Sequence, residues 1–276
     1  MEIIKFIQQF SNEFLDVFFT IVTYSGAQTL GIFVSIILFW CYDKKLGYRF
    51  LYGVIFSFSL NNSIKGFFNS PRPIGVEGII SSHVSTATGS SFPSGHSQGN
   101  ATSFTLLMSK FKNKWLWTFG ILMIILVPLS RLYFGVHWPI DVFVGTLLGI
   151  ISVIISNKIF NTYLNKGIFI LIISLVAFLS IGLLFPSNDL YKAIGSFSAL
   201  VLGIYIEDEF IGYNPNGSKS NNIKKIFIGL TGALIIYFIF SIFNSSLLIS
   251  FVKYFAITLY AIVLAPLIFI RLKLNR

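Results

Sequence analysis

Three short segments of the sequence carry side chains that bind anions or move protons. They are residues 65–73 (KGFFNSPRP), residues 93–96 (PSGH), and residues 130–141, which begin with Ser-Arg and reach His137 and Asp141. Together they supply cations, imidazoles and a carboxylate. Metal-free transfer of a phosphoryl group requires this set: positive charge on the phosphoryl oxygens, one nucleophile and one proton donor.

The cations of these segments are Lys65, Arg72 and Arg131. A guanidinium presents planar donors that fit phosphate oxygens, and an ammonium adds a compact charge. Buried together without an anion, the three groups would repel one another and would be costly to remove from water. The alternative is that each anchors the chain to lipid headgroups, as interfacial Lys and Arg often do. Their position beside two histidines favours an anion-binding site.

Residues 93–96 are typical of a helix start. Ser94 is a good N-cap, Gly95 allows the backbone to approach a ligand closely, and the free N–H groups of a first turn favour an anion. His96 lies in that turn, where it could donate a proton to a leaving oxygen. The alternative is an ordinary helix cap with an interfacial histidine.

His137 and Asp141 are four positions apart, so they share one face of the helix that begins near Pro139. An aspartate beside a histidine fixes the ring tautomer and stabilises the imidazolium, which leaves the other ring nitrogen free to attack phosphorus. The alternative is a structural pair that secures the helix start. The third histidine, His83, matches no pattern and is interpreted as a plain loop residue.

A metal site is the main rival interpretation of these side chains. Two histidines and one aspartate would suit a zinc ion. The three cations would repel such a dication, however, and no cluster of carboxylates in the sequence offsets them. We therefore expect a site without a metal or any other cofactor. The single cysteine, Cys41, excludes a disulfide framework and a cysteine-based metal site.

The composition places these segments in a membrane protein. Of the 276 residues, 55% are apolar and only 11% are charged, against about 25% charged in soluble domains. A soluble fold of this size could not bury that much apolar surface, so the sequence predicts an all-α, polytopic transmembrane helix bundle. The net charge of +10 comes from basic residues in twos and threes between apolar runs, without the dense basic stripe of a nucleic-acid-binding protein.

Nine apolar runs are long enough, or nearly so, to cross a bilayer. They are residues 25–42, 47–66, 95–110, 115–134, 139–160, 167–186, 190–206, 224–244 and 248–270. The third run is short and begins with polar residues, so we expect it to face the interior of the bundle. Residues 1–24 are typical of an interfacial amphipathic helix, and residues 207–223 of a flexible cytoplasmic linker.

Basic residues are unevenly divided between the two sides of the predicted bundle. Alternate loops on one side hold 14 of the 20 Lys and Arg residues, so the positive-inside rule assigns that side to the cytoplasm. The N-terminus is then outside, the C-terminus is inside, and all three chemical segments lie on the outer face. The outer loop at 69–93 is rich in Pro, Gly, Ser and Thr, which is typical of turns and coil. We expect a multi-pass protein of a bacterial cell membrane.

Taken together, the three segments resemble the type 2 phosphatidic acid phosphatase (PAP2) family of integral-membrane lipid phosphatases. The family pattern is K-x6-RP, then PSGH, then SR-x5-H-x3-D, and it occurs here in order and without a departure. The resemblance covers about residues 25–186, which implies a six-helix core. Residues 187–276 add about three spans that lie outside the resemblance and have no assigned role.

The resemblance implies a role for each residue of the pattern. His137 would be the nucleophile that forms a phosphohistidine, Asp141 would orient it, and His96 would be the general acid. The phosphate would be held by Lys65, Arg72, Ser94, the Gly95 amide and Arg131. No metal or cofactor would be needed, and the reaction would take place at the outer leaflet.

The predicted function is therefore metal-independent dephosphorylation of a membrane lipid phosphate or pyrophosphate. The site sits at helix ends, where a headgroup lies while its tails stay in the bilayer. Prenyl pyrophosphate, phosphatidate, phosphatidylglycerophosphate and sphingoid-base phosphate stay open as substrates, as does the oligomeric state. One alternative is a phosphotransferase that passes the phosphoryl group from the same phosphohistidine to an acceptor hydroxyl; another is a non-catalytic lipid carrier. A vanadate-dependent oxidase shares the anion-pocket motif but ranks lower, because the resemblance implies a soluble protein for that class.

Overall fold

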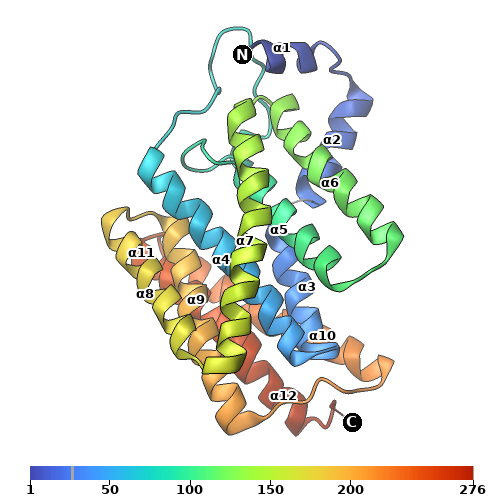
Figure 1. The fold of residues 1–276 in the computed structure, drawn as a ribbon, viewed down its shortest axis with the longest axis vertical. Helices are drawn as coiled ribbons and strands as arrows, with labels where there is room; N and C mark the ends of the chain where they lie inside the picture. Colours follow the sequence, from blue (N-terminus) through green and yellow to red (C-terminus); the bar gives the residue numbers. More distant parts are fainter. Residues whose placement is uncertain (26–27, 276) are drawn as a thin grey trace. The chain divides into compact units, whose positions relative to one another are not determined.

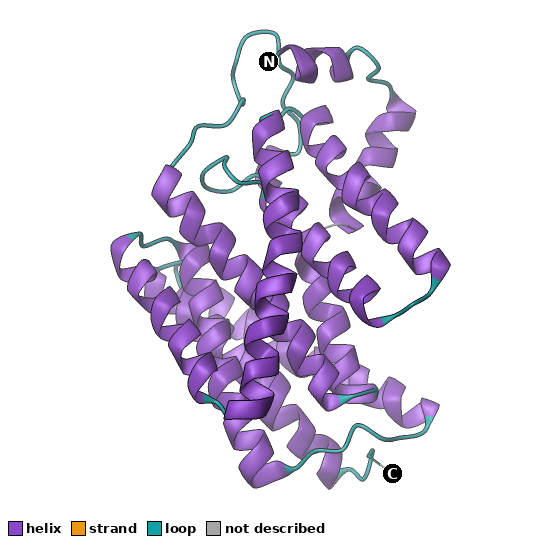
Figure 2. Ribbon diagram, in the orientation of Figure 1, coloured by secondary structure: helices purple, strands orange, loops and turns teal. Residues whose placement is uncertain are grey.

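The computed structural model describes residues 1–25 and 28–275, and every regular element in that part of the chain is a helix (Figure 1, Figure 2). The all-α prediction is therefore confirmed for the described residues. The chain forms two compact units: unit 1 comprises Met1–Gly31 and Leu60–Ile155, and unit 2 comprises Ile32–Ser59 and Ser156–Arg276. All three chemical segments lie in unit 1.

Unit 1 contains the helices that frame the three segments. In chain order its elements are α1 (Glu2–Gln8), α2 (Glu13–Ser25), the C-terminal part of α4 (Lys44–Phe68), the 3-10 turn η1 (Val84–Thr86), α5 (Gly95–Lys110), α6 (Lys114–Tyr133) and the N-terminal part of α7 (Pro139–Lys166). Within this unit α6 packs against α5, α2 and α1 (Figure 1). The N-terminal helices are therefore part of the packed unit.

Unit 2 holds most of the C-terminal helices. It comprises most of α3 (Gln28–Cys41), the rest of α4 and α7, α8 (Phe169–Leu184), α9 (Asn188–Ile206), η2 (Glu207–Ile211), α10 (Lys219–Ser241), α11 (Leu247–Leu259), η3 (Tyr260–Leu264) and α12 (Ala265–Arg271). Close packing of α9 and α11 depends on Gly195, because a Cβ there would lie 2.3 Å from the carbonyl oxygen of Phe251.

Over the described residues every predicted span coincides with helix, and residues 26–27 of the first span lie outside the described part of the chain. Fewer than nine of these helices have the length and composition of a membrane span. Five do, and α2 with α3 would make a sixth if the pair forms one span. The five are Lys114–Tyr133, Pro139–Lys166, Asn188–Ile211, Lys219–Ser241 and Leu247–Arg271. The helix α4 is too polar, and α5 is both too polar and, at 16 residues, too short. Their buried polar groups, such as Asn61 and Gln98, face protein instead of lipid. At 16 residues, α8 is shorter than the roughly 20 that a bilayer requires.

Two glycines of α7 allow its close approach to α5. A Cβ at Gly145 would lie 2.7 Å from the carbonyl oxygen of Ser94, and one at Gly149 would lie 2.5 Å from that of Gln98. Small residues four positions apart let two helix backbones come together in this way. The backbone N–H of Ser94 donates to the carbonyl oxygen of Asp141 at 3.0 Å. The PSGH segment is thereby fixed beside the start of α7.

The N-terminal residues 1–24, predicted as an interfacial helix, form α1 and α2, which bury one face within unit 1. Ile4 is fully buried in an apolar cluster with Ile79, Leu132 and Val142. The opposite face exposes apolar side chains such as Phe14, as an amphipathic segment at a bilayer surface would. The segment therefore contributes to the protein core as well as to the surface.

Segment 207–223, predicted as a flexible linker, is ordered over its first part because two of its side chains are buried. The π-helical turn η2 follows directly on α9, and the exposed fractions of Glu207 and Tyr213 are 0% and 2%. The Glu207 carboxylate accepts a hydrogen bond from the Tyr48 hydroxyl at 2.7 Å and one from the backbone N–H of Tyr213. The prediction of flexibility is wrong for this part of the segment.

Candidate active site

The loop at 88–90 holds the side chain of Arg72. The guanidinium donates from Nε to the carbonyl oxygen of Gly89 at 3.1 Å, and from Nη2 to those of Thr88 at 2.7 Å and Ser90 at 3.2 Å. Its Nη1 donates to the carbonyl oxygen of Val136 at 2.9 Å. Because backbone groups from two segments hold the planar guanidinium, its orientation is fixed before any ligand binds.

A second cation shares one of these carbonyl groups. The Lys65 ammonium also donates to the carbonyl oxygen of Ser90, so the first and last residues of the K-x6-R pattern lie close together. Burial lowers the pKa of Arg72 to about 10, while the charge of Asp141 acts to raise it. Arg72 therefore remains a cation at neutral pH, and two positive charges are present at this point of the site.

The His137 ring lies between a cation and a carboxylate. Its Nε2 is 3.0 Å from Arg72 Nη1, and its Nδ1 is 3.3 Å from Asp141 Oδ2. A guanidinium only donates, so Nε2 must be the acceptor and Nδ1 must carry the proton that faces Asp141. His137 and Asp141 are each only 1% exposed. The predicted pairing of the two residues is present, and it leaves the Nε2 lone pair as the nucleophilic atom.

Asp141 is held by a residue, Ser91, that no motif in the sequence indicates. Its Oδ2 accepts hydrogen bonds from the Ser91 hydroxyl and from the backbone N–H of Trp138, the latter at 2.8 Å. Ser91 is fully buried, 50 positions before Asp141 in the chain, and no spacing rule connects the two. The carboxylate is therefore oriented by two donors in addition to the imidazole.

Burial and nearby charge keep the His137 ring neutral. Burial lowers the pKa of His137, and the positive charges of Arg72, Lys65 and Arg131 lower it further, whereas the hydrogen bond with Asp141 acts to raise it. The influence of Lys65 and Arg72 on this ring shows that segment 65–73 lies beside segment 130–141. A neutral imidazole is the form that can act as a nucleophile.

Arg131 is the most deeply buried of the three cations, with no exposed surface. Its Nη1 donates to the Thr23 hydroxyl at 2.9 Å and its Nη2 to the Thr86 hydroxyl at 3.0 Å. Within residues 1–25 and 28–275 both partners are neutral, and the buried Nε has no partner at all. A buried guanidinium without a counter-charge is costly, so these donors favour binding of an anion.

The PSGH segment begins α5 as predicted. Ser94 is the N-cap, and its hydroxyl oxygen accepts hydrogen bonds from the backbone N–H of Ser97 at 3.4 Å and from the Ser97 hydroxyl at 3.0 Å. Gly95 is the first residue of the helix, and His96 follows it in the first turn. The prediction of a capped helix start is confirmed.

His96 belongs to the same cluster as the other motif residues. Arg131, His137, Arg72 and Lys65 all lie close enough to act on its charge. The second imidazole therefore lies within electrostatic range of the nucleophile and of all three cations. Burial and these charges lower the pKa of His96 to about 3, so the ring is neutral in the free enzyme. The proton-donor role that the resemblance implies therefore requires the negative charge of a bound phosphate to raise this pKa.

His83, interpreted from sequence as a plain loop residue, makes specific contacts. Its Nε2 lies 3.1 Å from the Thr20 hydroxyl oxygen, and its ring centroid lies 4.1 Å from that of Phe134. Its backbone is left-handed, with φ of 55°, directly before η1. The residue therefore packs into unit 1 instead of lying free in the loop.

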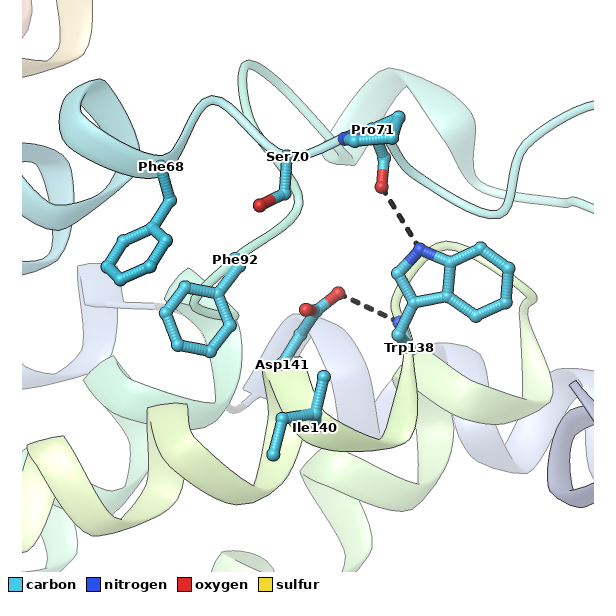
Figure 3. A pocket seen from close by; sticks show the side chains of 7 residues that line it. All are labelled: Phe68, Ser70, Pro71, Phe92, Trp138, Ile140 and Asp141. Carbon is cyan, nitrogen blue, oxygen red and sulfur yellow. Dashed lines mark hydrogen bonds between the residues drawn. The ribbon is translucent and has the colours of Figure 1, made fainter.

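A pocket of about 290 Å³ adjoins the carboxylate of Asp141 (Figure 3). Apart from Asp141, its lining is mainly apolar: Phe68, Ser70, Pro71, Phe92, Trp138 and Ile140. Phe68 and Phe92 meet edge to face at 5.0 Å between ring centroids, and Trp138 Nε1 donates to the carbonyl oxygen of Pro71 at 3.0 Å. The pocket therefore offers a space with fixed aromatic walls beside the His–Asp pair.

Fold and site together define a multi-pass helical membrane protein with a His–Asp pair among three cations. The sequence model of the PAP2 superfamily matches residues 46–164, which include all the motif residues, and that of the PAP2 superfamily phosphatase transmembrane extension matches residues 191–276. The chain belongs to the PAP2 superfamily. The C-terminal helices, which the motif resemblance left out, thus match a family model of their own.

Individual relatives support the same assignment. The chain is 33% identical over 116 residues to an undecaprenyl-diphosphatase of Sulfolobus acidocaldarius, covering 42% of this chain and 55% of that protein. It is 31% identical over 173 residues to a dihydrosphingosine 1-phosphate phosphatase of Schizosaccharomyces pombe, covering 56% and 41%. The crystal structure of Aquifex aeolicus LpxE superposes with a TM-score of 0.51 at 34% identity, covering 57% of this chain and 93% of that one. The chain spans about half the length of the curated relatives it matches.

Proposed function

We propose that this protein removes phosphate from a membrane lipid phosphate or pyrophosphate at the outer face of the membrane, without a metal, through a phosphohistidine on His137. The observation that carries the proposal is the position of His137 Nε2, 3.0 Å from Arg72 Nη1. The nucleophilic atom is thus in contact with a fixed cation that is suited to hold a phosphoryl oxygen. Membership of the PAP2 superfamily supports the same chemistry.

In the first step, Lys65, Arg72 and Arg131 neutralise the phosphoryl oxygens. Binding of the phosphoryl group replaces the hydrogen bond from Arg72 Nη1 to His137 Nε2 with one to a phosphoryl oxygen, and the freed Nε2 lone pair attacks phosphorus. The N–P bond forms as the bond from phosphorus to the ester oxygen breaks, and His96 gives its proton to that leaving oxygen. The Asp141 carboxylate stabilises the positive charge that develops on the His137 ring.

In the second step, water attacks the phosphohistidine. His96, now neutral, accepts a proton from the water as the new P–O bond forms. The N–P bond breaks, its electron pair returns to His137 Nε2, and inorganic phosphate leaves. If an acceptor hydroxyl took the place of water, the same intermediate would make the protein a phosphotransferase, so the identity of the product separates the two functions.

The surroundings of the site support a lipid as substrate. The mainly apolar pocket beside Asp141 offers space for the hydrocarbon that follows a phosphate ester. On α7, the exposed apolar side chains of Ile140, Phe143 and Ile151 continue from the pocket along the helix, so a chain leaving the pocket would meet a lipid-facing surface. The named activities of the relatives on undecaprenyl and sphingoid phosphates fit this class.

The distribution of basic residues supports an outward-facing site, with the N-terminus outside and the C-terminus in the cytoplasm. The direct test of the function is a phosphate-release assay of the purified protein in detergent against a panel of lipid phosphates and pyrophosphates. Release of free phosphate as the sole product supports the phosphatase. Transfer to an acceptor alcohol supports the phosphotransferase, and lipid movement that survives loss of His137 supports a carrier.

We expect chelators to leave the activity unchanged and orthovanadate to inhibit it, because the phosphoryl charge is neutralised by side chains. Within residues 1–25 and 28–275, no three His, Cys, Asp or Glu side chains are grouped so as to hold a metal ion. The measurement is phosphate release after dialysis against EDTA, with and without added divalent cations. An enzyme that is lost on chelation and regained with a metal would favour the zinc alternative.

The enzyme should stay active at a lower pH than an enzyme whose nucleophilic histidine has the usual pKa. Because burial and the nearby cations lower the pKa of His137, the ring stays neutral and nucleophilic at pH values below about 6.5, the usual histidine value. We expect kcat/KM, which reports the free enzyme, to fall only at more acidic pH. The pH profile of kcat/KM is measured with two substrates whose phosphate groups have different pKa values. A limb that has the same pKa with both substrates belongs to the enzyme. If kcat/KM falls with an apparent pKa of 6.5 or higher for both substrates, the pKa of His137 is not lowered, and His137 is not the neutral nucleophile described here.

A further inference from the structure

We infer that Thr23 of the N-terminal helix α2 is a positioning residue for Arg131, and that α2 is therefore part of the catalytic unit although it lies outside residues 46–164. The inference rests on the proposed function, because it assigns Arg131 to the phosphoryl oxygens. Thr23 is fully buried, and its hydroxyl oxygen accepts a hydrogen bond from Arg131 Nη1 at 2.9 Å.

The chemistry of this contact suits a cation that has to bind a phosphate. A carboxylate partner would orient Arg131 equally well, but it would neutralise the guanidinium and repel the incoming anion. A threonine hydroxyl accepts one N–H and carries no charge. Thr23 and Thr86 take one N–H from each terminal nitrogen of the guanidinium. Of its five N–H groups, the remaining three, including the unpartnered Nε–H, stay available for phosphoryl oxygens.

Apolar contacts on both sides of Thr23 fix the position of α2. Phe19, one turn earlier, packs with Tyr133 and Phe134 at the end of α6. Val22, the residue before Thr23, packs with Met123 and other residues of α5 and α6. The hydroxyl is thus held where the helix is buried and where its position does not depend on Arg131 itself.

The hydroxyl of Thr86, the second acceptor for Arg131, is also held in place by contacts from α2. The Thr86 hydroxyl donates to the carbonyl oxygen of His83 at 2.7 Å while it accepts from Arg131. The Thr20 hydroxyl donates to the carbonyl oxygen of Asp16 at 2.6 Å, so it can only accept from His83, whose Nε2 is the donor across 3.1 Å. Thr20 and Thr23, three positions apart on one face of α2, therefore fix both sides of the Arg131 guanidinium.

The test compares Thr23→Val with Thr23→Ser. Valine keeps the shape of threonine and removes the hydroxyl, so we expect kcat/KM to fall about 10- to 100-fold, as it does when a group that orients a binding residue is lost. Serine keeps the hydroxyl and should restore most of the activity. The matched control is Thr118→Val on α6, whose exposed hydroxyl donates to the carbonyl oxygen of Lys114 in its own helix; it should keep wild-type activity.

Two further measurements separate positioning from folding. In an Arg131→Ala background, Thr23→Val should cause no further loss, because the hydroxyl acts only through the guanidinium. The stabilisation of the protein by orthovanadate in thermal unfolding should be weaker in Thr23→Val than in wild type, and this readout needs no turnover. The inference is overturned if Thr23→Val equals wild type in both assays, if Thr23→Ser does not rescue, or if the loss is the same without Arg131. If vanadate stabilises the wild type more than Thr23→Val but the wild type releases no phosphate, the proposed function alone fails.

Discussion

Replacing His137 by alanine is expected to abolish turnover, lowering kcat by about 10⁴-fold or more, as loss of a nucleophile does in other enzymes that form covalent intermediates. The neutral Nε2 is the atom in contact with the Arg72 guanidinium, and alanine offers no nucleophile in its place. The measurement is phosphate release by the purified variant, made alongside its thermal stability in the same detergent. Substantial activity in a well-folded variant would remove His137 from the mechanism.

A direct view of the intermediate strengthens this test. Wild-type protein quenched during turnover of a labelled lipid phosphate should carry a phosphoryl group that is stable in base and released in acid, as expected for phosphohistidine. The His137→Ala protein should carry none. A phosphoprotein with acid-stable label in the variant would show that another side chain is the nucleophile, even if the overall activity had fallen.

Local features of the site were predictable from the sequence because they depend on residues that are close in the chain. The pairing of His137 with Asp141 follows from four-residue spacing at a helix start, and the cap at Ser94 follows from the preference of such positions for a hydroxyl. The positive-inside rule places all three segments on the same face of the membrane. The charges that act on His137 and the hydrogen bond from Ser94 to Asp141 agree with that placement.

The supporting contacts could not be predicted, since they join residues that are far apart in sequence and have no characteristic spacing. Ser91 and Thr23 each contribute a single hydroxyl, to Asp141 and to Arg131, and serine and threonine are common everywhere in this chain. One longer-range signal was available: the glycines at 145 and 149 form the small-residue spacing of a close helix contact. That spacing would have indicated a close helix partner for α7.

Fewer helices than predicted have the length and composition of a lipid-facing span, for a related reason. Residues 47–66 and 95–110, in α4 and α5, are predicted as spans because they are apolar runs of sufficient or nearly sufficient length, although the second begins with polar residues. Their polar side chains, such as Asn61 and Gln98, bond to each other at 2.8 Å inside unit 1. A helix that is surrounded by protein can hold such groups, whereas a helix that faces lipid cannot. The polar start of residues 95–110 indicates from the sequence that α5 faces protein, whereas the surroundings of Asn61 in α4 follow only from its packing partner.

Asp141→Asn is expected to lower kcat by about 10³- to 10⁴-fold with little change in protein folding, as the equivalent change does in a serine protease triad. Oδ2 of Asp141 accepts hydrogen bonds from Ser91, Trp138 and His137, and these three donors suit a carboxylate. An asparagine oxygen placed there would lack the charge that stabilises the imidazolium. An asparagine NH₂ placed there would force the His137 proton onto Nε2, which removes the nucleophilic lone pair.

The kinetic signature of this variant distinguishes orientation from binding. Because Asp141 acts on the ring through Nδ1 and Lys65, Arg72 and Arg131 hold the phosphoryl oxygens, KM should change much less than kcat. The matched control is Asp189→Asn, which breaks a partly exposed ion pair with Lys192 outside the site and should leave both constants near wild type. If Asp141→Asn raised KM and left kcat unchanged, Asp141 would be part of substrate binding. The Asp141 carboxylate would then not be the group that prepares His137 Nε2 for attack.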